Sequence, residues 1–163
     1  MQTRLYLVVA ILLLAATPFA AQPRRDALVF ITSKNQTTTS LSTAELRNIY
    51  LGRTTRWKNG RRILVIVRPP AMPAGREFLD RVVRMSEIDF SQDWLGAVFR
   101  GEAAAAPRVI GSTDAVRKAI AENTDAIAFV LSSELVAEDE TSIRVLAVDG
   151  KTRDEPSYPF VIR

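Results

Sequence analysis

Short apolar runs alternate with amphipathic segments along the chain, and this alternation predicts strands separated by helices. The runs at 63–67 and 126–131 are apolar at every position, which is typical of strands covered on both faces, as in a parallel sheet. The other β-rich runs that we interpret as strands are 27–32, 108–110 and 143–148.

Four segments between these runs have helical periodicity. Ser42 and Glu45 form a capping box, which predicts a helix that begins at Thr43 and ends at Gly52. A second helix is predicted over about 74–85, after three prolines. A third is expected to be capped by Ser91 and a fourth by Ser112 or Thr113. Their inward positions are expected to be Trp94, Leu95, Val98 and Phe99 in the third helix, and Ala115, Val116, Ala119 and Ile120 in the fourth.

The order of these elements predicts an α/β fold. We expect one domain over residues 22–163, a three-layer α/β/α sandwich with a mostly parallel sheet. A length of 163 residues is that of one ordinary globular domain.

The first 21 residues have the pattern of a secretory signal peptide. Arg4 precedes an apolar run over 5–16, and the small residues Ala20 and Ala21 follow. The run is too short to cross a bilayer comfortably. The sequence therefore predicts a cleaved signal over 1–21, a periplasmic or secreted product, and no stable membrane anchor after cleavage.

The composition excludes most familiar catalytic chemistry. The chain has no cysteine and no histidine, which removes thiolate nucleophiles, Ser-His-Asp triads, disulfides and the usual zinc ligands. We expect no enzyme activity, no catalytic residues, no metal site and no cofactor. The net charge of +4 favours anionic partners, although export argues against nucleic acid.

One corner of the predicted fold suits an anion. Arg68 follows a strand directly and precedes a helix, so its guanidinium and the amides of Ala74, Gly75 and Arg76 are candidate anion-binding groups. The alternative is that Arg68 only pairs with a carboxylate. The basic turn over 53–62 is a second cationic feature. Its Trp57 is expected to pack in the core, with cations that are either solvated or attracted to anionic lipid or polysaccharide.

Several motifs in order resemble the phosphate-binding family of type II periplasmic binding proteins. They are LRNIYLGRTTRWKNG over 46–60, the strand that ends at Arg68, the strand over 126–130, the turn over 148–151, and Tyr-Pro-Phe over 158–160. The resemblance covers about residues 27 to 163. It implies one lobe of a two-lobed protein that captures phosphate or another oxyanion.

The chain also departs from this family. Family members follow the arginine with a Gly-Ser-Gly-Thr turn, whereas residues 69–76 here read PPAMPAGR and lack its hydroxyls. The segment that would build most of the other lobe has no counterpart. The leading interpretation is a non-enzymatic domain, similar to the substrate-binding proteins of phosphate ABC transporters, with weak phosphate or oxyanion binding. The alternative is an accessory module whose groove, left by the missing lobe, binds a protein partner or a second copy without a small-molecule ligand.

Overall fold

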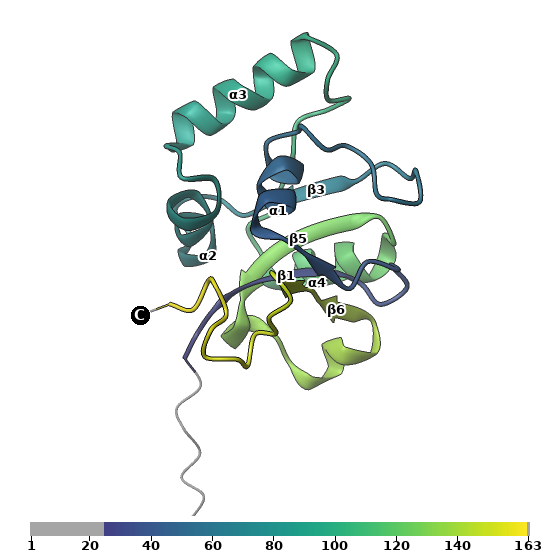
Figure 1. Cartoon of the computed structure of the whole chain (residues 1–163), viewed down its shortest axis with the longest axis vertical. Coiled ribbons are helices and arrows are strands. Elements are labelled where there is room, and N and C mark those ends of the chain that lie inside the picture. The colour runs from purple at the N-terminus through teal and green to yellow at the C-terminus, as the bar shows by residue number, and fades with distance from the viewer. Residues whose placement is uncertain (1–24, 163) are drawn as a thin grey trace, which may run out of the picture.

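The computed structural model describes residues 25–162, in which helices cover a mixed five-stranded sheet (Figure 1). The predicted signal peptide over 1–21 lies outside the described residues. Within the described part, no helix has both the length and the apolar character needed to cross a membrane.

The sheet is mixed, because one central strand runs against the others. The strand order is β4-β3-β5-β1-β6. β3 pairs in parallel with β4 and β5, whereas β1 pairs antiparallel with both β5 and β6. The α/β prediction is confirmed, with four strands running one way and β1 the other. The strands are β1 (Leu28–Ser33), β3 (Leu64–Val67), β4 (Arg108–Val109), β5 (Ala126–Leu131) and β6 (Ile143–Val145).

The strand predicted over 143–148 is divided in two. Its second part, β7 (Ala147–Val148), leaves the main sheet and pairs in parallel with β2 (Ser40–Leu41). The turn that follows places Asp149 at a positive φ of 50°. Its carboxylate accepts hydrogen bonds from the backbone N–H of Thr43 at 2.9 Å and from the Thr43 hydroxyl at 2.6 Å, which ties this turn to the start of α1.

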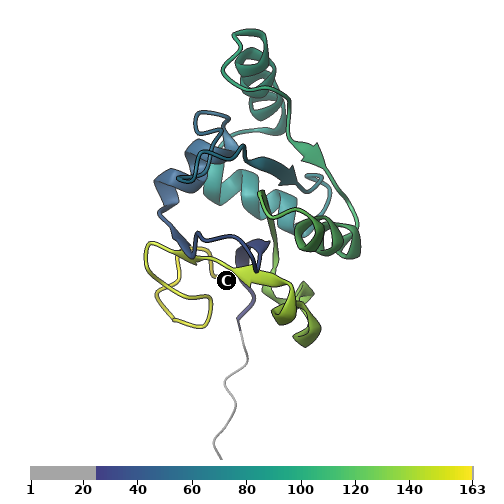
Figure 2. The ribbon, with the colours of Figure 1, turned by 90° about the vertical axis from the view of Figure 1, so that its right-hand side faces the viewer.

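Helices cover both faces of the sheet, as the three-layer prediction requires (Figures 1 and 2). α4 packs against β1, β5 and β6, whereas α2 contacts β5 and α1 contacts the segment after α2. The helices are α1 (Thr43–Tyr50), α2 (Pro73–Glu77) with its π-helical continuation η1 (Phe78–Val83), α3 (Glu87–Phe99) and α4 (Thr113–Glu122), and the short 3-10 turns are η2 (Ser132–Glu134) and η3 (Ala137–Thr141).

The predicted helix caps are confirmed at two helices and wrong at α3. Both hydrogen bonds of the Ser42 and Glu45 capping box are present, and the Ser112 hydroxyl accepts from the N–H of Ala115. α3 begins five residues earlier than predicted, because Ser86 rather than Ser91 is its cap. The left-handed conformation of Arg84, with φ of 54°, ends the preceding helix and permits this early restart.

Aromatic rings fill the core between the sheet and the helices that precede α3. Phe129 of β5 stacks on Phe78 with ring centroids 4.3 Å apart, and Tyr50 and Phe30 contact the same ring. Trp57 is buried and its indole N–H donates to the Asp125 carbonyl at 3.0 Å. The prediction that Trp57 packs in the core is confirmed.

Three predicted inward positions are wrong. Leu95 and Phe99 of α3 are 57% and 82% exposed, and Ala115 of α4 is exposed as well. α3 therefore has a second apolar face, in addition to the one that buries Trp94 and Ala97.

Candidate functional site

Arg68 directly follows β3, as predicted. Its side chain is buried, with only 1% of its surface exposed. The guanidinium does not face solvent. Its Nη2 donates to the Gly111 carbonyl at 2.9 Å and to the Thr113 hydroxyl at 3.2 Å, and it contacts the Met72 sulfur at 3.3 Å. These contacts tie the end of β3 to the start of α4.

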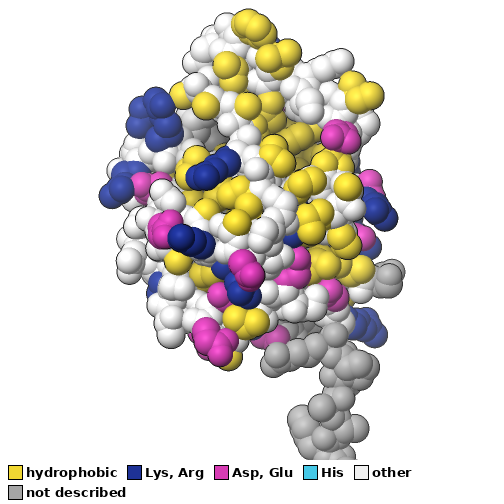
Figure 3. Space-filling model, turned by 180° about the vertical axis from the view of Figure 1, so that it is seen from behind, with side chains coloured by type: hydrophobic (Ala, Val, Ile, Leu, Met, Phe, Trp, Pro, Cys, Tyr) yellow, Lys and Arg dark blue, Asp and Glu magenta, His cyan; other side chains and the backbone are white. Residues whose placement is uncertain are grey.

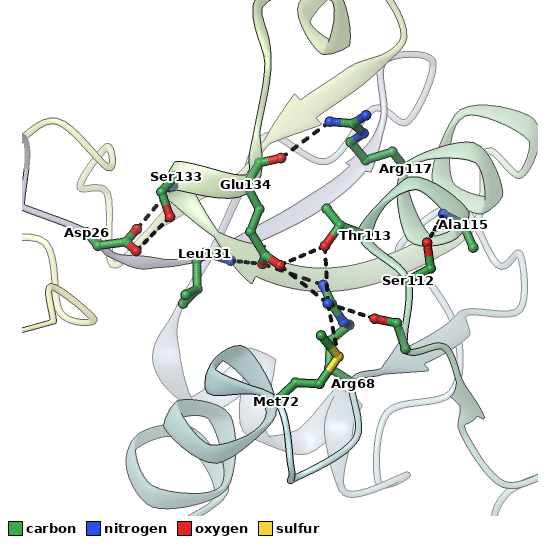
Figure 4. Close-up of polar contacts among 11 residues, drawn as sticks. Asp26, Arg68, Met72, Ser112, Thr113, Ala115, Arg117, Leu131, Ser133 and Glu134 are labelled. Atoms are coloured by element: carbon green, nitrogen blue, oxygen red, sulfur yellow. Dashed lines mark hydrogen bonds and ion pairs between the residues drawn. The ribbon is translucent and has the colours of Figure 1, made fainter.

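The carboxylate of Glu134 completes this corner (Figure 4). It accepts from the two terminal nitrogens of Arg68 at 3.3 and 3.5 Å, from the Thr113 hydroxyl at 2.7 Å and from the Leu131 N–H at 2.8 Å. A guanidinium, a hydroxyl and a backbone amide are the donors that typically hold an oxyanion. Here all three donate to a carboxylate of the same chain.

The other predicted binding residues lie in the first turn of α2. Ala74 and Gly75 are buried, and Arg76 is exposed. Gly75 packs closely against the backbone that follows β3. A Cβ atom added at Gly75 would lie only 2.2 Å from the carbonyl oxygen of Pro69. Within residues 25–162, no hydrogen bond joins the Arg68 guanidinium to 74–76, so their role in anion binding stays a prediction.

Sequence reasoning missed Thr113, Leu131 and Glu134, although their positions carry a signal. Thr113 follows β4 by a few residues, and Glu134 follows β5 in the same way. β4, β3 and β5 are parallel neighbours, so their carboxyl ends meet at one edge, where ligand-binding groups of α/β sheets gather. The signal for all three residues is therefore that they end or closely follow β4 and β5, the strands next to β3.

One donor of the corner is unused. The Nε of Arg68 is buried without a hydrogen-bond partner in the described part of the chain. Buried polar atoms usually have a partner. The guanidinium can therefore donate one more hydrogen bond than it does here.

Asp26 fixes the turn that carries Glu134. It accepts from the hydroxyls of Ser132 and Ser133 at 2.8 and 2.7 Å, and from the N–H groups of Ser133 and Ala27. Burial alone would raise the pKa of Asp26, but these hydrogen bonds outweigh it and hold that pKa below its usual value. The charged form of Asp26 therefore stabilises the turn.

We expect Asp26→Asn to destabilise the protein by about 1 kcal/mol at pH 7, because an amide cannot replace the ionised acceptor. A lowered native pKa contributes stability above the unfolded pKa of about 4 and loses it as the pH falls through the native value. The difference between wild type and variant should therefore shrink below about pH 4. Urea unfolding at pH 7 and at pH 3 measures it, and a difference that stays constant would contradict this role.

The basic turn over 53–62 forms a hairpin that precedes β3, whereas Arg68 follows β3. Its cations are solvent-exposed, and two have partners, since Arg61 pairs with Asp125 at 2.7 Å and Arg56 donates to the Gly60 carbonyl at 2.7 Å. In the described residues, no group of three or more acidic side chains is placed to hold a metal ion.

Comparison with solved structures assigns the fold. The first match is a phosphate ABC transporter substrate-binding protein from Clostridium perfringens with bound phosphate, with a TM-score of 0.65, 20% identity, and coverage of 84% of this chain and 53% of that one. This fold matches about half of a phosphate-transporter substrate-binding protein. No family model and no curated protein sequence matches the chain.

Two further structures support the same assignment. A phosphate transport receptor from Vibrio cholerae matches with a TM-score of 0.60 at 17% identity, covering 78% of this chain and 48% of that one. PstS from Borrelia burgdorferi also scores 0.60, at 18% identity, with 79% and 49% covered. The chain spans about half the length of these proteins, and the prediction that it resembles one lobe is confirmed for the fold.

Proposed function

We propose that this chain is an exported, non-enzymatic binding-protein-like domain in which Glu134 occupies the anion site. The observation that carries the proposal is the convergence of Arg68, Thr113 and the Leu131 amide on the carboxylate of Glu134. This carboxylate lies at the carboxyl edge of the sheet, where a binding protein holds its ligand.

Free phosphate must displace this internal carboxylate in order to bind. Glu134 is tethered three residues beyond the end of β5, so its effective concentration at Arg68 is far above that of a dissolved anion. We therefore expect the unmodified chain to bind phosphate with a dissociation constant no tighter than about 1 mM, or about 4 kcal/mol.

Glu134→Ala should open the site, because it removes the internal anion and leaves the three donors. We expect calorimetric titration with inorganic phosphate to give at least tenfold tighter binding than wild type. The double variant Arg68→Met/Glu134→Ala should lose that gain. Glu138→Ala is a matched control, since it removes an exposed carboxylate from the neighbouring turn η3.

Micromolar phosphate binding by the wild type, or no tightening in Glu134→Ala, would contradict the proposal. Circular dichroism should first establish that each variant is folded. A rise in the melting temperature of Glu134→Ala with added phosphate gives a second readout, because a ligand that binds only the folded state stabilises it.

A second candidate function is protein recognition. The observation that favours it is the apolar face of α3 on which the side chains of Leu95 and Phe99 are exposed to solvent. This role is independent of the anion corner, and the two can be tested separately.

A further inference from the structure

Large apolar side chains gather on α3 and on the adjacent edge strand β4. Ile88 and Phe99 of α3 are 69% and 82% exposed, and Val109 of β4 is 64% exposed, with Leu95 between them. Figure 3 shows apolar side chains gathered over the upper part of the molecule, where α3 lies. Among the residues that the structure describes, Val136 is the only other exposed large apolar side chain.

These residues form a stripe beside a hollow. Ile88, Leu95 and Phe99 are spaced by seven and four positions, which places them on one face of α3. The stripe borders a hollow of about 280 Å³ between α3 and the end of β4. Its apolar lining consists mainly of Phe90, Trp94, Leu95, Val98, Pro107 and Val109.

The patch has the size of an interface core. Four large side chains exposed to this degree present apolar area on the order of 500 Å², at the upper end of what monomers expose. A standard interface buries about 800 Å² on each partner. The stripe, with the polar positions around it, is large enough to supply that area.

We propose that this face joins two copies of the chain, through antiparallel α3 helices related by a two-fold axis at Leu95. The proposal names the partner for the second candidate function and does not involve Arg68. Under a two-fold axis the same patch faces itself, so one apolar surface supplies both sides of the contact.

The pairing places complementary groups opposite one another. With the axis at Leu95, Phe99 of one copy lies opposite Ser91 of the other, and Ser91 lines the hollow. The small side chain of Ser91 therefore leaves room for the exposed ring of Phe99. Antiparallel helices also align their dipoles favourably.

The charges of α3 leave the stripe itself apolar. The first half of α3 carries Glu87, Asp89 and Asp93, and Arg100 follows its last residue. Asp89 and Arg100 are six and five positions from Leu95, which places both on the side of α3 that points away from the proposed axis. Arg100 also pairs with Glu102 of its own chain at 2.7 Å, so the proposed affinity comes from apolar burial.

Sedimentation equilibrium of the purified chain between about 1 and 200 μM tests association. We expect a monomer–dimer equilibrium in the tens of micromolar, weakened at least tenfold by Leu95→Glu. Val136→Glu is the matched control, since it makes the same kind of change at an exposed apolar site outside the patch. All variants begin at the same residue, so any effect of the N-terminal segment is shared.

A wild type that stays monomeric at 200 μM, or a Leu95→Glu variant that associates like wild type, would overturn the proposal. The phosphate titrations of Glu134→Ala do not depend on this face, so failure here leaves the anion proposal standing.

Cross-linking tests the register. Because the chain has no cysteine, Leu95→Cys introduces a single thiol at the proposed axis. Under mild oxidation we expect this variant to form disulfide-linked dimers at least tenfold faster than Val136→Cys. Equal rates would rule out the two-fold axis at Leu95.

Discussion

Phe129→Ala should destabilise the fold by about 4 kcal/mol, because it empties the centre of the aromatic core. The Phe129 ring is fully buried and stacks on Phe78 at 4.3 Å and an interplanar angle of 8°. Its contacts with Tyr50 and Phe30 would be lost together. Chemical denaturation monitored by circular dichroism measures the loss.

Phe99→Ala is the matched control, since it makes the same chemical change at a ring that is 82% exposed. At protein concentrations of about 1 μM, where the proposed dimer is dissociated, we expect it to change stability by less than about 0.5 kcal/mol. Comparable costs for the two variants would contradict the assignment of Phe129 to the core and Phe99 to the surface.

Glu134→Ala should cost about 3 kcal/mol, because it leaves the Arg68 charge buried without its carboxylate. The two partners differ in exposure, with 1% for the Arg68 side chain and 24% for Glu134. Water can therefore replace the missing partner at Glu134 more readily than at Arg68. We expect Arg68→Met to cost less than Glu134→Ala.

A double-mutant cycle measures this asymmetry. Arg68→Met/Glu134→Ala should be more stable than the sum of the single effects implies, because no charge is left alone in the corner. Urea denaturation of the four proteins in phosphate-free buffer gives the coupling. Additive losses, or a larger loss for Arg68→Met, would show that the two charges do not depend on each other.

The fold was predictable from local patterns, because apolar runs and capping residues act over a few positions. The box formed by Ser42 and Glu45 and the run over 126–131 both predicted elements that are present. The direction of β1 was not predictable, since its run is apolar at every position whichever way the strand points. Leu95 and Phe99 were assigned to the core because helical spacing reports an apolar face without saying what covers it.

The candidate site was predictable only in part. The position of Arg68 after a strand and before a helix follows from the sequence. Its partner does not, because Glu134 is 66 residues away and reaches it only through the pairing of β3 with β5. Arg68 does pair with a carboxylate in the structure, as the alternative interpretation expects. An external anion can therefore bind to Arg68 only by displacing Glu134.

The antiparallel position of β1 has a consequence for how the chain matures. The first strand to be synthesised is flanked on both sides by strands from the last third of the sequence, and Ala27 bonds to Ser132 across 105 positions. Such distant pairings form slowly, and the sheet cannot close until nearly all of the polypeptide has left the ribosome. For the proposed export, this means that the chain can remain unfolded until a translocation pore accepts it.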